Sequence, residues 1–213
     1  VPGDKFFSSI LCGVRASLHK RRSSMIHEVV LVDAQDVQIG VCDKRDAHLG
    51  AGQLHRAFSV HLIDSRGRHL LQRRAADKML WAGFWSNACC SHPAPGETIL
   101  DAASRRLREE LGVWASCRAL YYFEYHALFG SIGAEHELCH VLVAQSDAEV
   151  SPVPEEVSDI KWLTRAEITA QLAEPRAPFT PWFRMQWQRL LSEHPSFDAP
   201  RAEATLPPLG RGA

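Results

Sequence analysis

The sequence predicts an α+β fold in a single domain, and three observations support this prediction. Several segments rich in β-branched and aromatic residues are separated by Gly- and Pro-containing turns, one amphipathic helical segment lies near the middle, and another helical segment lies near the C-terminus. The 213 residues suffice for one ordinary domain with a real hydrophobic core. Long strands combined with few helices favour a mixed sheet with helices packed against it.

The first half of the domain is predicted to be mostly strands. Four segments have strand-like composition: 26–32, 37–41, 54–63 and 69–74. Residues 44–53 are polar and contain glycine, so we expect a loop there. Residues 64–67 end in Gly67, which can take a positive φ, so we expect a hairpin turn between the last two of these strands.

The clearest predicted helix is 97–110, and it follows an irregular stretch at 75–96. Its apolar stripe is formed by Leu100, Ala103 and Leu107, at spacings of three and four residues. Glu97 would lie in its first turn and Gly112 just beyond its end, and both positions suit a helix.

The C-terminal half continues the alternation of strands and helices. Three more segments have strand-like composition: 119–127, 138–144 and 157–163. The sequence Thr164-Arg165-Ala166-Glu167 is a capping box that predicts the start of a short helix. Residues 181–191 predict the last helix, with Pro181 in its first turn.

The two ends differ in composition from residues 25–193, which we take as the domain. Residues 1–24 are basic, rich in serine and contain a single acid, Asp4, which is typical of a transit peptide. The same residues are also explained by a non-native tail that precedes a natural start at Met25, and we slightly favour this second explanation. Residues 194–213 are rich in proline and glycine and predict a loose C-terminal tail.

Charge and cysteine usage limit the partners and the compartment. The net charge of −1 predicts neither a nucleic-acid partner nor an anionic membrane, and no apolar run is long enough for a transmembrane helix. The six cysteines show no metal-binding spacing, so we expect reduced thiols. A reducing compartment, the cytoplasm, fits them, or an organelle if residues 1–24 are a transit peptide.

Chemistry-bearing residues concentrate between Trp85 and Val113. The predicted helix carries Glu97, Glu109 and Glu110, which could rim a pocket and hold Mg²⁺ together with a substrate phosphate. A solvated acidic helix face explains the same residues equally well.

Residues 105–113 resemble the Nudix box, the pattern that carries the Mg²⁺ ligands of Nudix hydrolases. Five positions match it when its paired glutamates are aligned on Glu109 and Glu110: Glu97, Arg105, Leu107, Gly112 and Val113. Two positions depart, because Ser91 replaces the first Gly and Arg106 replaces a Glu. An arginine there suits holding a diphosphate rather than cleaving it.

Three further motifs resemble the type 1 isopentenyl-diphosphate isomerase family, a branch of the Nudix superfamily. They are Trp85-Ser86-Asn87-Ala88-Cys89-Cys90-Ser91-His92-Pro93, Glu135-His136-Glu137-Leu138-Cys139, and Ala47-His48 followed by Leu54-His55-Arg56-Ala57-Phe58-Ser59. The resemblance covers about Met25 to Glu193. It implies a Nudix-type α/β/α sandwich with a mixed sheet and a monomer.

The resemblance also implies the site residues. One divalent metal, Mn²⁺, Zn²⁺ or Mg²⁺, would be held by His48, His55, His92, Glu135 and Glu137. The Mg²⁺ that bridges to the diphosphate would be held by Glu110, and the diphosphate would be bound by Lys44, Arg74, Lys78 and Arg106. The catalytic groups would be Cys90, Glu137, Tyr125 and Trp182. The remaining histidines are expected to be structural or exposed.

The implied reaction interconverts isopentenyl and dimethylallyl diphosphate through a tertiary carbocation, without flavin. Cys90 and Glu137 would be the acid–base pair, with Tyr125 as a relay and Trp182 facing the cation. Two alternatives remain: a Nudix hydrolase acting on a nucleoside diphosphate derivative, and a catalytically inactive diphosphate- or partner-binding module.

Overall fold

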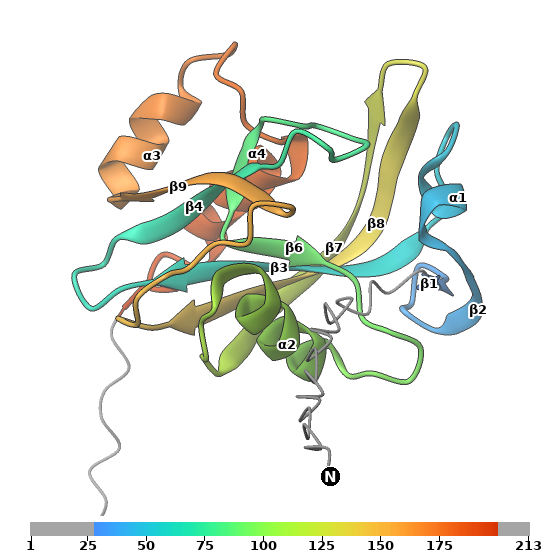
Figure 1. Cartoon of the computed structure of the whole chain (residues 1–213), viewed down its shortest axis with the longest axis horizontal. Helices are drawn as coiled ribbons and strands as arrows, with labels where there is room; N and C mark the ends of the chain where they lie inside the picture. The colour runs from blue at the N-terminus through green and yellow to red at the C-terminus, as the bar shows by residue number, and fades with distance from the viewer. Residues whose placement is uncertain (1–27, 200–213) are drawn as a thin grey trace, which may run out of the picture.

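The computed structural model describes residues 28–199, which fold into one mixed sheet with helices on both of its faces (Figure 1). The strands are β1 (Glu28–Val32), β2 (Gln38–Asp43), β3 (His55–Ile63), β4 (His69–Arg74), β5 (Trp85–Asn87), β6 (Cys89–Ser91), β7 (Cys117–Phe129), β8 (Gly133–Gln145) and β9 (Val157–Leu163). The helices are α1 (Lys44–His48), α2 (Ile99–Leu111), α3 (Arg165–Leu172) and α4 (Pro181–Glu193).

Strand β3 is the centre of the sheet. It pairs with β1, β4 and β6 in antiparallel orientation and with β8 in parallel orientation, from His55 opposite Glu137 to Ile63 opposite Gln145. The predicted turn after β3 is confirmed, with Gly67 at φ 73°. However, β3 and β4 pair only at Ile63 and His69. Strand β4 pairs with β5 and β9, so these three strands form a part of the sheet that is joined to β3 by that single pair.

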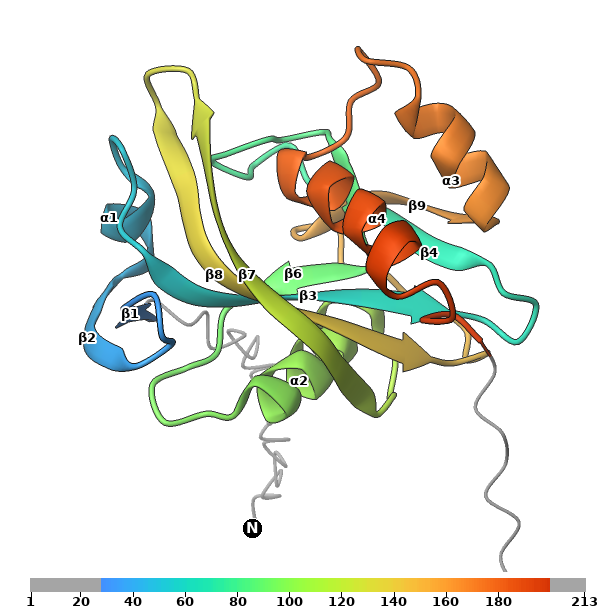
Figure 2. The same cartoon turned by 180° about the vertical axis from the view of Figure 1, so that it is seen from behind.

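The two faces of the sheet carry separate hydrophobic cores. Helix α2 lies on one face and α4 on the other (Figures 1 and 2). Side chains alternate along a strand, so Leu142 of β8 packs on the α2 side whereas Val141 and Val143 pack on the α4 side. The aromatic side chains Trp182, Phe183 and Trp187 of α4 fill the second core. The layered α/β/α arrangement with a mixed sheet is therefore confirmed.

Helix α2 confirms the prediction with two corrections at its N-terminal end. Thr98 is the N-cap and accepts a hydrogen bond from the Asp101 amide, so Glu97 lies before the helix instead of in its first turn. Leu100 is 45% exposed, and Leu111 takes its place on the buried stripe. Gly112 ends the helix in the left-handed conformation, as expected.

Two segments predicted to lack regular structure contain short elements. The expected loop at 44–53 begins with α1, which the Asp43 side chain caps by accepting a hydrogen bond from the Arg45 amide. This helix is too short to show an apolar stripe. The irregular stretch at 75–96 contains β5 and β6, and β6 pairs with β3 so that Cys90 lies opposite Ser59.

The C-terminal end of α4 does not lead directly into a loose tail. Phe197 is buried in the α4 core, and Asp198 forms an ion pair with Arg165 and a hydrogen bond with His69, so residues 194–199 pack against the domain. The expectation of a loose tail from His194 is wrong for these six residues. Residues 200–213 lie outside the described part of the chain, as do residues 1–27 with the transit-like segment. Among the described residues, no helix has the length and apolar character needed to cross a membrane.

Candidate active site

A cavity of about 850 Å³ opens between α1, the β7–β8 hairpin and the N-terminal end of α4. All the predicted site residues line it except His55 and Glu110. Cationic side chains, metal-ligand types and an apolar wall therefore share one space. Such a cavity suits a small molecule with a charged end and an apolar end.

Five of the predicted metal ligands form one buried cluster beside this cavity. The candidate ligand atoms of His48, His55, His92, Glu135 and Glu137 all lie within 4.8 Å of one another. The fold explains the convergence, because His55 lies opposite Glu137 in the parallel β3–β8 register. Glu135 and Glu137 are two residues apart on β8 and share one face of it.

One ring nitrogen of each histidine faces the centre of the cluster. His48 and His55 direct Nδ1 at the backbone carbonyls of Lys44 and Gln53, which fixes Nε2 as the inward-facing nitrogen. His55 Nε2 and His92 Nε2 lie 3.1 Å apart, and His92 Nε2 lies 3.1 Å from Glu137 Oε1. This spacing of nitrogen and oxygen atoms suits a shared divalent cation.

The electrostatics of the cluster agree with a cation site. Burial lowers the pKa of His55 to about 4 and that of His92 well below its usual value, so both rings are neutral, the form that binds metals. Burial and the neighbouring Glu135 raise the pKa of Glu137, because two carboxylates cannot both ionise in a dry site without a cation. Three imidazole nitrogens and two carboxylates fit a divalent metal ion.

Cys90 lies at the cavity and is held by several polar groups. Its thiol donates to Asn87 Oδ1 at 2.9 Å, and Trp182 donates its indole N–H to Cys90 Sγ at 3.2 Å. Burial raises the thiol pKa, while hydrogen bonds from Ser59, Ser86 and Trp182 act in the opposite direction. Cys89 points to the other face of β6 and is completely buried against the α2 core.

Tyr125 and Glu137 form a second polar pair in the same cavity. They face each other in the antiparallel β7–β8 register, and Tyr125 Oη donates to Glu137 Oε2 at 2.6 Å. The apolar wall beside them is the indole of Trp182, which packs edge to face against Trp81 at 5.3 Å between ring centroids. The Arg74 guanidinium carbon lies 5.3 Å from the Trp182 ring centroid.

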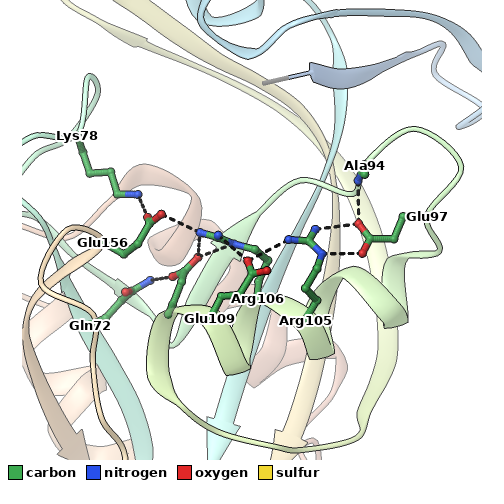
Figure 3. Close-up of polar contacts among 9 residues, drawn as sticks. Gln72, Lys78, Ala94, Glu97, Arg105, Arg106, Glu109 and Glu156 are labelled. Carbon is green, nitrogen blue, oxygen red and sulfur yellow. Dashed lines mark hydrogen bonds and ion pairs between the residues drawn. The ribbon is translucent and has the colours of Figure 1, made fainter. Parts of the chain in front are cut away.

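The predicted diphosphate-binding cations all line the cavity, and two of them, Lys78 and Arg106, share the Glu156 carboxylate (Figure 3). Burial and the nearby charges of Lys78 and Arg106 lower the pKa of Lys44. Lys78 forms an ion pair with Glu156, and Arg106 Nη2 donates to Glu156 Oε1 at 3.0 Å. These two cations, in consequence, hold the pKa of Glu156 down at about 2 although burial acts to raise it.

Sequence reasoning did not identify Glu156. It lies in the loop between β8 and β9, after two prolines, Pro152 and Pro154, and belongs to no motif. No local signal could have found it, because its partners are distant in sequence: Arg106 is 50 residues away and Lys78 is 78 residues away.

The expected rim of helix carboxylates is not present at the cavity. Arg105 donates to Glu97 at 2.7 Å, and Glu109 accepts hydrogen bonds from both Arg105 and Arg106 (Figure 3). Glu110 is buried, accepting from Arg106 Nη2 at 2.6 Å and from Gln72. None of these three carboxylates lines the cavity, and they form an ion-pair network that orients Arg106.

Comparisons with known proteins agree with the fold. The NUDIX domain family matches residues 53–183. The Deinococcus radiodurans protein DR0079 superposes with a TM-score of 0.63 and 25% identity over 76% of this chain and 98% of its own. A MutT NUDIX hydrolase from Burkholderia pseudomallei superposes with a TM-score of 0.51 and 21% identity over 65% of this chain and 98% of its own, and supports the fold alone.

Two relatives are similar over most of this chain. One, named isopentenyl-diphosphate Delta-isomerase 1, from Photorhabdus laumondii, is 40% identical over 79% of this chain and 97% of its own length. Another, named isopentenyl-diphosphate Delta-isomerase, from Nocardia farcinica, is 46% identical over 72% of this chain and 89% of its own. Fold and site define a Nudix-fold enzyme with a buried cluster suited to a divalent metal ion. Within that class, the chain belongs to the isopentenyl-diphosphate delta-isomerase family.

Proposed function

We propose that this enzyme interconverts isopentenyl diphosphate and dimethylallyl diphosphate for isoprenoid biosynthesis. The observation that carries the proposal is one cavity in which a buried thiol, a carboxylate–phenol pair and an indole ring lie beside a group of cations. A double-bond shift needs an acid and a base on the substrate, together with an apolar wall for the intermediate cation.

The charged end of the substrate would be bound by the cations. Lys44, Arg74, Lys78 and Arg106 supply positive charge at the cavity, and the arginines supply forked donors that match phosphate oxygens. Mg²⁺ would be held by Glu110, whose carboxylate would have to exchange its hydrogen bonds with Arg106 and Gln72 for the ion. The diphosphate then has to replace Glu156 as a partner of Lys78 and Arg106.

The proton steps would take place between Cys90 and Glu137. One group gives a proton to the terminal alkene carbon, which leaves a tertiary carbocation, and the other removes a proton from the carbon two positions away, so the proton count is unchanged. Tyr125 would pass the proton to or from Glu137 through its 2.6 Å hydrogen bond. The Trp182 ring would stabilise the cation, an attraction worth ~2 kcal/mol or more when desolvated.

The metal in the His/Glu cluster would be Mn²⁺, Zn²⁺ or Mg²⁺. Three imidazoles and two carboxylates would hold it, and when bound it supplies positive charge that tunes the proton affinity of Glu137. No flavin is needed, because the reaction moves protons only. The bacterial relatives and the free cysteines support a cytoplasmic enzyme. We propose that it acts as a monomer, with every proposed site residue supplied by one chain.

The proposal is tested with isopentenyl diphosphate, Mg²⁺ and Mn²⁺ in heavy water. We expect dimethylallyl diphosphate that carries deuterium, with no release of phosphate. Phosphate or pyrophosphate without any isomerised product would identify a hydrolase instead. Binding of the substrate without turnover would identify an inactive binding module.

A further inference from the structure

A chain of buried polar side chains leads from Cys90 into the core beneath α4. It consists of Ser59 and His61 on β3 and Gln186 on α4, and each is at most 2% exposed. Ser59 lies opposite Cys90 in the β3–β6 register, and its Oγ is 3.5 Å from Cys90 Sγ. None of these three residues belongs to the cavity lining, so the proposed chemistry does not yet explain them.

The hydrogen bonds along this chain run in one direction. Gln186 Oε1 lies 3.2 Å from His61 Nε2, and burial lowers the pKa of His61 to about 3, so its ring is neutral and donates a single N–H there. That bond orients the amide of Gln186, whose Nε2 then donates to Ser59 Oγ at 3.0 Å. Because Ser59 Oγ already accepts this bond, its own hydrogen is available for a sulfur atom.

Two sulfur atoms lie within reach of that hydrogen. Cys90 Sγ is 3.5 Å and Cys139 Sγ is 3.4 Å from Ser59 Oγ. Cys139 is completely buried and also accepts a longer contact from Gln186 Nε2 at 3.7 Å, whereas Cys90 faces the cavity. Asn87 accepts the thiol hydrogen of Cys90 at 2.9 Å. The Cys90 sulfur can therefore accept the hydrogen of the Ser59 hydroxyl when the thiol takes part in chemistry.

Buried polar groups of this kind cost stability unless they are all satisfied, and an apolar core would avoid that cost. We propose that Gln186 is a positioning residue of the reaction, which orients the Ser59 hydroxyl toward the sulfur of Cys90 and so holds that sulfur at the substrate. This inference rests on the proposed function of Cys90. His61 supports it by fixing which end of the Gln186 amide faces Ser59.

The test is a double-mutant cycle with Gln186→Met, Ser59→Ala and the double variant. Methionine keeps the length of the side chain but removes the amide donor. We expect each single variant to lower kcat about tenfold with KM changed less than about twofold, a loss of about 1.4 kcal/mol. The double variant should lose no more than Ser59→Ala alone, because Gln186 acts only through Ser59.

Thr169→Val is the matched control. It removes a hydrogen bond from Trp187 Nε1 to Thr169 Oγ1 at 3.1 Å, so it perturbs the packing of α4 without removing any hydrogen bond between Cys90, Ser59, Gln186 and His61. We expect it to lower the melting temperature while kcat stays at the wild-type value. Equal losses of kcat in Thr169→Val and Gln186→Met, or losses that multiply in the double variant, would overturn the proposal.

A second readout does not need turnover. Iodoacetamide alkylates Cys90, and the rate is measured on the proteolytic peptide that contains Cys90. This rate should fall in Ser59→Ala and in Gln186→Met, because the attacking sulfur loses a hydrogen-bond donor. The rate at Cys117, which is partly buried and remote from this chain, should not change. If the wild type fails to isomerise the substrate but the alkylation rates shift, only the proposed function fails. If it isomerises and the rates at Cys90 do not shift, only the positioning role fails.

Discussion

Replacing Glu156 with glutamine tests whether its negative charge stabilises the fold and competes with a diphosphate for Lys78 and Arg106. In the structure its carboxylate accepts hydrogen bonds from both Lys78 and Arg106, which are two of the proposed diphosphate-binding groups. Glutamine keeps the shape and the acceptor oxygen but removes the charge. The variant should therefore be less stable, and it should bind a diphosphate more tightly because the competing carboxylate charge is gone.

The size of the stability loss follows from the pKa of Glu156. Its pKa falls from the ordinary 4.5 to about 2, which sets a ceiling of about 3 kcal/mol. The side chain keeps 22% of its exposure, so solvent screens the pairs and we expect about 1–2 kcal/mol. Because the folded pKa is depressed, this stability is present above pH 4.5 and is lost as the pH falls through about 2.

The assay is urea unfolding of wild type and Glu156→Gln at pH 7 and at pH 3. The difference in unfolding free energy should shrink at pH 3 to less than half of its value at pH 7. Magnesium pyrophosphate titrated at pH 7 should bind Glu156→Gln about tenfold more tightly, which is ~1.4 kcal/mol. Glu155→Gln is the control, because Glu155 also lines the cavity, is exposed, and has no ion pair within residues 28–199.

Two results would refute this reasoning. A stability difference that does not depend on pH would mean that the carboxylate charge is not what matters. Pyrophosphate affinity that falls in Glu156→Gln, or that rises equally in Glu155→Gln, would show that Glu156 does not compete with the diphosphate.

Three further predictions concern the thiol, the metal cluster and the hairpin. Cys90→Ala should abolish deuterium incorporation. Cys89→Ala, which truncates a core side chain on the other face of β6, should keep most of it. Equal loss in both variants would show that the choice of Cys90 is wrong. Adding Mn²⁺ to chelator-treated protein should raise the melting temperature in the wild type but not in His48→Ala, and an equal rise in both would place the metal elsewhere. Gly133→Ala should cost at least ~2 kcal/mol in urea unfolding, because the added Cβ would lie 2.1 Å from the His48 carbonyl oxygen. In the same hairpin, Gly130→Ala meets no atom within 4 Å and should cost about 1 kcal/mol, from its positive φ alone.

Local sequence signals predicted the elements whose stability is local. The Thr164 capping box and the Gly112 helix end are present as predicted, because both depend on residues within one turn. Helix α1 was missed because it has one turn and its cap is a single side chain, that of Asp43. The parallel pairing of β3 with β8 joins residues 82 positions apart at His55 and Glu137, and no local pattern contains it.

The site was predictable where motifs carry it. The five metal-ligand candidates were named from three separate motifs, and the fold brings them together. Their roles in binding and catalysis remain predictions. Glu156 could not be found, because its importance comes from two cations that the fold places beside it. Gln186 and Ser59 are 127 residues apart in sequence, and only the tertiary structure shows that Gln186 contacts Ser59 and that Ser59 contacts Cys90.

The β7–β8 hairpin also limits how sequences of this kind can change in length. It carries Tyr125 on one strand and Glu137 on the other, and both must face the cavity. Because side chains alternate, a shift of one residue in the pairing would turn one of them to the opposite face of the sheet. A single-residue insertion between Tyr125 and the tip, or between the tip and Glu137, would have to be absorbed by a bulge. Length changes confined to the tip at 130–132 leave the pairing intact, so we expect natural insertions and engineered peptide tags to be tolerated there and not along the strands.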